Sequence, residues 1–121
     1  MITLKSHGFK FSRPEANIVF DVSYLVNPWR EKRIREEEDP IKRKDMIMEF
    51  MLLQEGVMVL VRYLSDLVAW YGVMFANENI QIAFCCSAGE YRSPAMVALV
   101  ADELERRNIK FIIKQNENSK I

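Results

Sequence analysis

The chain has 121 residues and a mass of 14.2 kDa, which is room for one domain, and half of its residues are apolar, which excludes a disordered protein. Lys and Arg together number 17, as do Asp and Glu, and this balance excludes the overall basic surface that alone would indicate nucleic-acid binding. The two cysteines, Cys85 and Cys86, are adjacent, which excludes a disulfide-stapled secreted domain.

The sequence also argues against export and membrane insertion. The N-terminal residues alternate between apolar and polar side chains and do not resemble a signal or transit peptide. The most apolar region, residues 46–75, contains Glu49, Glu55, Arg62 and Asp66, so no uncharged stretch reaches the ~18 residues of a bilayer span. We therefore expect a cytoplasmic protein without a membrane segment.

The first half of the chain predicts strands followed by helices. Residues 2–12 alternate between apolar and polar side chains, which predicts one strand or two short strand pieces. Residues 17–22, NIVFDV, form a β-branched and aromatic run typical of a strand buried on both faces. The highly charged residues 30–45 predict a solvated loop or lid that leads into a helix. Apolar residues then recur every three or four positions over residues 41–71, which predicts one helix broken near Gly56 or two consecutive helices.

The second half predicts a further strand, a helix and a last strand. Residues 80–86, IQIAFCC, are typical of a buried strand, and Ser93 and Pro94 match a helix start with Ser93 as the N-cap. We expect this helix to end at Asn108 and to carry ion pairs on its outer face, Asp102 with Arg106 and Glu103 with Arg107. Residues 110–114 predict a short strand and residues 115–121 a frayed tail.

This order of elements predicts a single α/β domain over residues 1–121. Strands that alternate with helices pair in parallel, because each helix carries the chain back to the same end of the sheet. We therefore expect a small, at least partly parallel sheet with helices packed on it.

The segment FCCSAGEYRSPA, residues 84–95, carries the chemistry. It places Cys86 at the end of a strand and Arg92 at the beginning of a helix, so that loop N–H groups and the helix N-terminus can face one anion. We expect a phosphate site in which Gly89 supplies backbone freedom and Arg92 donates two hydrogen bonds. The expected ligand-binding residues of this strand–loop–helix unit are Cys86, Ser87, Ala88, Gly89, Glu90, Tyr91, Arg92 and Ser93.

The spacing C-x5-R-S resembles the signature loop of the cysteine-dependent protein phosphatases. In such an enzyme Cys86 would be the catalytic nucleophile, Arg92 the phosphate clamp, and an aspartate the general acid. Asp21 and Asp39 are the candidates for that acid, although neither lies in a recognisable acid loop. Two other interpretations stay open: an anion-binding loop without catalysis, and a structural turn in which Cys86 is a small core residue and Arg92 pairs with a core carboxylate such as Asp21.

A second segment, residues 6–28 with the sequence SHGFKFSRPEANIVFDVSYLVNP, resembles the opening of the C-terminal domain of the bacterial RNase adapter protein RapZ. GFK, VFDV and NP match in order, and CSAGEYRS stands where that family has a Gly-rich Cys loop that ends in Arg-Ser. The resemblance covers about residues 6–104. It implies a regulatory domain that binds a phosphorylated aminosugar, glucosamine-6-phosphate or a related metabolite, and that contacts a small RNA. We therefore expect a phosphorylated small molecule as ligand, an aminosugar phosphate or a nucleotide-like one.

Several features depart from the family pattern. Ala88 replaces a glycine, Tyr91 replaces a histidine, and Glu90 replaces a residue that is often basic and adds a carboxylate that would repel phosphate if it pointed inward. Full-length members also carry an N-terminal nucleotide-binding domain, whereas this sequence lacks G-x-x-x-x-G-K-[ST]. We therefore expect a stand-alone copy of the C-terminal domain.

Three residues outside the loop are further candidates for the ligand site. Lys10 lies near the expected end of the first strand, where it either contacts a phosphate or is simply solvated. Asn27 follows the second strand and either shapes a turn or faces the ligand. Arg35 matches an arginine of the family, and with Trp29 it could close over a sugar ring or belong to a charged surface loop.

The remaining expectations concern metals and partners. His7 is the only histidine and the cysteines lack further ligands nearby, so we expect no metal and no cofactor. The basic residues within 30–35 and 42–44 could contact RNA, although acidic residues lie between them. Residues 57–61 are apolar on every side of their helix, so we expect a homodimer. The leading hypothesis is a non-catalytic regulatory sensor; the alternatives are a cysteine phosphatase and an interaction protein with a structural loop.

Overall fold

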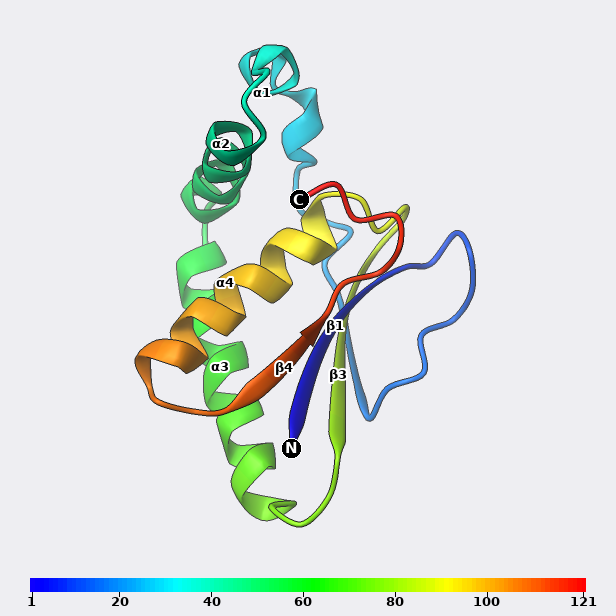
Figure 1. Cartoon of the computed structure of the whole chain (residues 1–121), viewed down its shortest axis with the longest axis vertical. Coiled ribbons are helices and arrows are strands. Elements are labelled where there is room, and N and C mark those ends of the chain that lie inside the picture. Colours follow the sequence, from blue (N-terminus) through cyan, green and yellow to red (C-terminus); the bar gives the residue numbers. More distant parts are fainter.

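The four strands of the protein form one parallel sheet (Figure 1). The computed structural model describes residues 1–121, and its strand order is β2-β3-β1-β4. The elements in chain order are β1 (Ile2–Gly8), β2 (Ile18–Asp21), the 3-10 helix η1 (Pro28–Arg30), α1 (Lys32–Glu36), α2 (Pro40–Leu53), α3 (Val57–Met74), β3 (Ile80–Cys86), α4 (Arg92–Arg106) and β4 (Phe111–Lys114). The predicted α/β class with a parallel sheet is confirmed.

Helices cover one face of the sheet, and the segment between β1 and β2 lies on the other (Figure 1). The connections from β2 to β3 and from β3 to β4 cross the sheet in one direction, while the connection from β1 to β2 crosses in the opposite direction. Because parallel connections share one hand, opposite directions place their segments on opposite faces. Residues 9–17 accordingly meet the side chains of Lys5, whose Nζ donates to Glu15 O (2.6 Å), and His7, whose Nε2 lies 2.8 Å from Ser12 O.

The core lies between the sheet and α4. Leu4 of β1, Phe84 of β3 and Met96 of α4 are completely buried and belong to one apolar cluster. Gly8 and Cys86 are partners in the register of β1 and β3, and Asp21 at the end of β2 is opposite Cys85. The carboxyl ends of these three strands therefore meet at one edge of the sheet, and the Cys86 loop begins at this edge.

Two strand predictions need correction. Residues 9–11 form a turn, closed by a hydrogen bond from Phe11 N to Gly8 O (3.1 Å), and not a second strand piece. The strand predicted to be buried on both faces is the edge strand β2, in which Val19 is 42% exposed. β-branched content indicates a strand, but the position of the strand in the sheet determines its burial.

The charged segment predicted as a loop is largely helical. It contains the last residue of η1, all of α1 and the first turns of α2, and Ile34 of α1 is fully buried. The Asp39 carboxylate accepts a hydrogen bond from Ile41 N, and Pro40 occupies the first turn of α2. An aspartate N-cap followed by proline is a strong helix start, so the local signal is present despite the surrounding charges.

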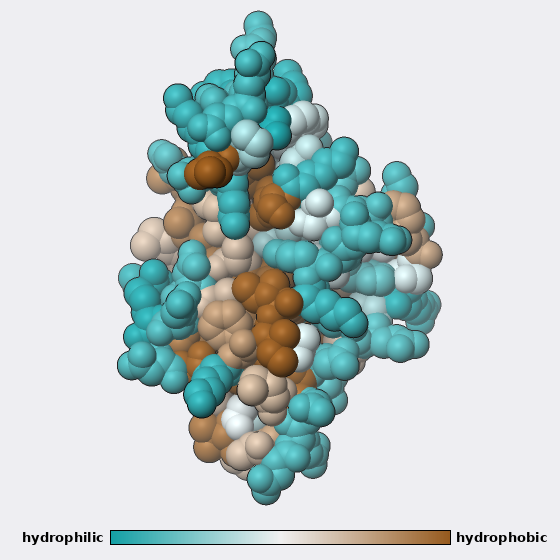
Figure 2. Space-filling view, in the orientation of Figure 1, coloured by the Kyte–Doolittle hydropathy of each residue, from teal (hydrophilic) through white to brown (hydrophobic).

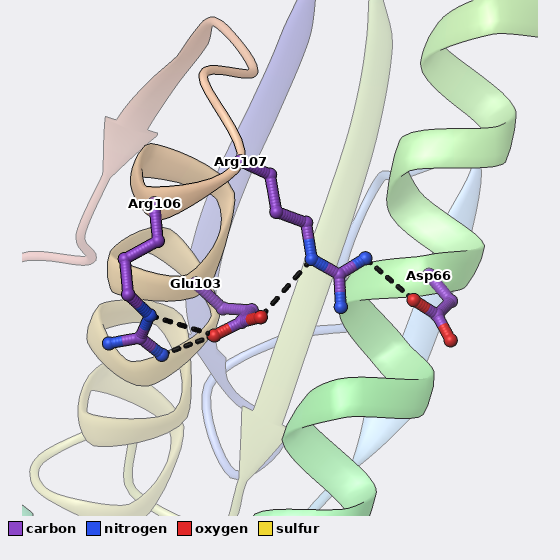
Figure 3. Close-up of polar contacts among 4 residues, drawn as sticks. All are labelled: Asp66, Glu103, Arg106 and Arg107. Atoms are coloured by element: carbon purple, nitrogen blue, oxygen red, sulfur yellow. Dashed lines mark hydrogen bonds and ion pairs between the residues drawn. The ribbon is translucent and has the colours of Figure 1, made fainter.

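Ion pairs connect α3 to α4 on the helical side (Figure 3). Arg107 Nη1 donates to Asp66 of α3 (2.6 Å), and Arg107 Nε donates to Glu103 of α4 (3.1 Å). Hydrogen bonds from Arg106, and then from Arg107, lower the pKa of Glu103. The predicted pair of Glu103 with Arg107 is thus confirmed, whereas Arg106 pairs with Glu103 and not with the predicted Asp102.

The helix α3 leaves much of its apolar surface uncovered. Its 18 residues have a mean hydropathy of 1.4, which suits a membrane span by length and composition and equally suits a helix of a folded core. Arg62 and Asp66 interrupt it, while Leu64 and Val68 are buried. Figure 2 shows hydrophobic residues over the middle and lower part of one face of the molecule, where Figure 1 draws β4 in front and the C-terminal end of α3 below it. The exposed apolar residues of α3 are Met58, Val59, Tyr63, Leu67, Trp70, Val73 and Met74.

Candidate functional site

The candidate site is the loop of residues 87–91 between β3 and α4. The loop packs directly on the end of β1, because a Cβ added to Gly8 would lie 2.7 Å from both the carbonyl carbon and the oxygen of Ala88. Gly89 has φ +71°, a left-handed conformation that strains residues with a Cβ. The two glycines thus let the chain turn sharply between the strand and the helix, close to the sheet edge.

Flanking segments hold the carbonyl groups of this loop. On one side, Phe9 N donates to Cys86 O (2.9 Å) and Lys10 N donates to Ser87 O (2.9 Å). On the other side, two donors come from the C-terminal residues. Asn116 Nδ2 donates to Gly89 O (2.9 Å) and Lys120 N donates to Glu90 O (3.0 Å).

The N–H groups of the loop have no such partners. None of the backbone N–H groups of residues 87–93 donates a hydrogen bond within the chain, and Tyr91 at the N-cap of α4 gives no side-chain cap. All peptide bonds are trans, so each N–H points away from the carbonyl of the preceding residue. Since four of those carbonyls are engaged by flanking donors, the N–H groups of Ser87, Ala88, Glu90 and Tyr91 point the opposite way and are free.

Arg92 lies over the same loop and is held in place by main-chain carbonyls. Its Nη1 donates to Ser23 O (2.5 Å) and Leu25 O (3.3 Å), and its Nη2 donates to Ser87 Oγ (3.0 Å). It forms no ion pair with Asp21 or with any other carboxylate, whereas the structural interpretation of the loop predicts one. The Nε–H and the second Nη2 hydrogen stay available to a ligand.

The thiol of Cys86 lies beneath the loop. It is 2% exposed, and its Sγ donates to Ser93 Oγ (3.3 Å), which in turn donates to His7 O (3.3 Å). Ser93 is therefore not the predicted N-cap: the N-cap is Tyr91 and α4 begins at Arg92, two residues before the predicted start, and the Ser93 hydroxyl points to the strands. Cys85 projects to the other face of the sheet, and its burial raises the pKa of its thiol to about 11.

The structure gives no support to the phosphatase alternative. The Asp21 carboxylate accepts hydrogen bonds from Ser23 Oγ (2.5 Å) and Ser23 N (2.9 Å). These bonds, helped by the charge of Arg92, lower the pKa of Asp21, which therefore stays ionised and is a poor proton donor. Asp39, the other candidate acid, is the N-cap of α2.

Two residues of the loop that depart from the family pattern point elsewhere. The Glu90 carboxylate lies 3.6 Å from Lys120 Nζ, so its charge is directed to the C-terminal residues. The buried Tyr91 ring stacks on Trp29 with a centroid distance of 4.9 Å, and the Arg43 guanidinium lies 5.9 Å from the centre of the Trp29 ring. Burial and the nearby Glu90 raise the pKa of Tyr91.

The candidates outside the loop have mainly structural contacts. Arg35 Nη1 donates to Trp29 O (2.8 Å) and Arg30 O (2.9 Å), so it closes η1 and does not lie over the loop. Asn27 caps η1 by accepting a hydrogen bond from Trp29 N (3.0 Å). Lys10 is the exception, because its backbone N–H joins the loop at Ser87, while its ammonium lies 5.5 Å from the Phe11 ring centre.

The C-terminal residues that contact the loop are not predicted by the sequence. Gln115 Nε2 donates to Pro94 O (3.1 Å), and Asn116 bonds both to the loop and to the buried Ser6 of β1. In the structure, residues 115–121 therefore lie against the loop, where the sequence predicted a frayed tail. The polar composition of this segment gave no signal for that contact. No group of three His, Cys, Asp or Glu side chains is arranged to hold a metal ion.

Comparison with known proteins identifies similar chains. A family model described as the RapZ C-terminal domain matches residues 1–119. A nucleotide-binding protein of Anaeromyxobacter sp. (strain K) is 32% identical over 108 residues, which cover 86% of this chain and 36% of the relative. Nucleotide-binding proteins of Lawsonia intracellularis and Caldanaerobacter subterraneus are 31% and 26% identical, over 88% and 97% of this chain. The chain spans between 34% and 42% of the length of these relatives.

Proposed function

The chain belongs to the family of RapZ C-terminal domains, and from that membership we propose that it is a regulatory sensor whose residues 86–93 bind the phosphate group of a small metabolite. Its relatives carry the name nucleotide-binding protein, which agrees with a phosphorylated ligand. The role is binding and not catalysis, because the site offers an anion cradle without a proton donor. We place this domain in the cytoplasm, where such metabolites occur.

One observation carries this proposal: the backbone N–H groups of residues 87–93 have no acceptor, while the loop carbonyls are held from outside. Unpaired amides around a loop at a helix N-terminus suit an oxyanion, since each amide can donate to a phosphate oxygen and the helix dipole favours negative charge. Arg92 adds a full positive charge at the same place. A doubly charged phosphate uses more of these donors than a carboxylate does.

Asp21 favours an amino group on the ligand. Its carboxylate lies at the carboxyl end of β2, next to the strand that ends in the loop, and it forms no ion pair with Lys or Arg. The negative charge of Asp21 beside a phosphate site disfavours a phosphorylated ligand whose other groups are also anionic, and it favours one that carries an ammonium group. An aminosugar phosphate fits this pair of charges better than a nucleotide.

The Asp21→Asn variant tests this assignment. We expect the wild type to bind glucosamine-6-phosphate roughly tenfold more tightly than glucose-6-phosphate, about 1.4 kcal/mol, and the variant to bind the two equally. Because the pKa of Asp21 is lowered, the wild-type ratio should be the same at pH 7 and pH 5 and should fall only on further acidification. Isothermal titration measures it; equal wild-type affinities would contradict the amino-group assignment.

We also propose a homodimer through the exposed apolar face of α3. The expected result is a sedimentation mass of two chains at micromolar concentration, and the mass of one chain would contradict it.

A contact with RNA through residues 30–44 is a separate proposal. Lys32, Arg33 and Lys42 of this segment already pair with neighbouring carboxylates, so we expect the contact to be weak and strongly salt-dependent.

A further inference from the structure

We propose that Asn116 is a positioning residue for the phosphate site and that residues 115–121 form a strap whose docking is coupled to anion binding. The proposal rests on the function proposed above and adds the element that regulates it. It assigns a role to a segment that follows the last strand and contributes no group to the anion itself.

Asn116 connects the loop to the sheet through its backbone N–H and its side-chain amide. Its backbone N and its Nδ2 donate to the buried Ser6 Oγ of β1 (3.0 and 2.7 Å), and the same Nδ2 donates to Gly89 O (2.9 Å). Its Oδ1 accepts a hydrogen bond from Asn118 N (2.8 Å), which fixes the orientation of the amide. A single side chain therefore connects Gly89 of the loop to Ser6 of β1.

The bond to Gly89 O matters because it sets the orientation of a peptide group. In a trans peptide the N–H of Glu90 points away from the carbonyl of Gly89, so Asn116 directs that N–H to the free side of the loop. Lys120 N does the same for the next peptide by holding Glu90 O (3.0 Å), which directs the N–H of Tyr91. The strap thus orients two of the free amides, at the point where the Gly89 backbone is most adaptable.

Coupling follows from linkage. An anion that binds the Glu90 and Tyr91 N–H groups stabilises the orientation of the two peptide groups to which these N–H groups belong. In the same orientation the carbonyls of Gly89 and Glu90 face the strap. Anion binding must then strengthen strap docking by the same factor by which docking strengthens anion binding. A partner that captures the strap would therefore change the affinity of the site, and the ligand would change the availability of the strap.

The test compares three variants with the wild type. Asn116→Ala removes the side-chain hydrogen bonds to Gly89 O and Ser6 Oγ without adding charge. Asn116→Asp keeps the shape and the acceptor for Asn118 N, but it removes both of these donor contacts and adds a negative charge. Asn118→Ala is the matched control, because the Asn118 side chain makes no hydrogen bond to the loop. Isothermal titration with inorganic phosphate and with glucosamine-6-phosphate gives the affinities, and thermal unfolding shows whether each variant is folded.

The expected result is a loss of affinity of about fivefold or more for both Asn116 variants and wild-type affinity for Asn118→Ala. A second readout, the hydrogen-exchange rate of the Lys120 backbone N–H that donates to Glu90 O, should fall on addition of phosphate to the wild type but not to Asn116→Asp. Wild-type affinity in folded Asn116 variants, or an exchange rate that phosphate does not change, would overturn the strap proposal alone. Absence of phosphate binding by the wild type would instead overturn the proposed function on which it rests.

Discussion

Replacing Arg92 with alanine is expected to weaken the binding of inorganic phosphate and of aminosugar phosphate by roughly 10- to 100-fold. The guanidinium supplies the only full positive charge that is fixed over the loop, and hydrogen bonds to charged partners contribute about 1.5 to 3 kcal/mol. Isothermal titration measures the loss. Because Arg92 also donates to Ser23 O and Leu25 O, the variant should unfold at a somewhat lower temperature as well.

Two further variants show why the Arg92→Ala substitution weakens phosphate binding. One tests whether positive charge alone is sufficient, and the other tests whether loss of any arginine of α4 has the same effect. Arg92→Lys keeps the charge but cannot reach both the Ser23 carbonyl and two phosphate oxygens, so we expect it to recover only part of the affinity. Arg106→Ala removes an exposed arginine at the other end of α4 and should bind phosphate like the wild type. If folded Arg92→Ala retained wild-type affinity, residues 86–93 would not be the anion site.

The second large effect is expected for Gly8→Ala. A Cβ at this position would lie 2.7 Å from backbone atoms of Ala88, and backbone cannot move aside as the end of a side chain can. We expect a loss of about 2 kcal/mol or more in the free energy of unfolding, within the range for overpacking, together with weaker phosphate binding because the loop is displaced. Chemical denaturation gives the first quantity and isothermal titration the second.

Gly72→Ala is the matched control for this prediction. The added Cβ would also meet an atom at 2.7 Å, but that atom is the terminal Cδ1 of Ile2, which can rotate away, and it lies far from the loop along β1. The control should lose less stability and should keep its phosphate affinity. Equal effects of the two substitutions on phosphate binding would show that general destabilisation, and not loop position, explains the loss.

The sequence predicts the strands and the loop well because both depend on local signals. The apolar run that ends in Cys86 and the periodic residues of α4 define β3 and its helix, and the structure confirms both. The predicted break near Gly56 is also confirmed, since this glycine has φ +81° and separates α2 from α3. Burial of β2 could not be predicted, because its place at the edge depends on the order of all four strands.

Only part of the candidate site can be predicted from the sequence, because the rest depends on contacts between segments that are distant in the sequence. Residues 86–93 are contiguous, so their chemistry shows as a motif, whereas the donors that hold their carbonyls come from Phe9, Lys10, Asn116 and Lys120. Nothing in the polar segment 115–121 indicates that it reaches the loop, because that contact arises only when β4 pairs with β1. The sequence predicts that Trp29 and Arg35 could close over a sugar, but in the structure Trp29 stacks on Tyr91 and Arg35 donates to the carbonyls of η1.

A titration of the 15N-labelled protein with inorganic phosphate, followed by amide chemical shifts, tests the anion cradle most directly. Phosphate oxygens that accept hydrogen bonds should shift the amide signals of residues 87–93 downfield, with Glu90 and Tyr91 among them, while the amides of α3 stay unchanged. Saturable shifts confined to the basic residues 42–44, or no saturable shift in residues 87–93, would contradict the account.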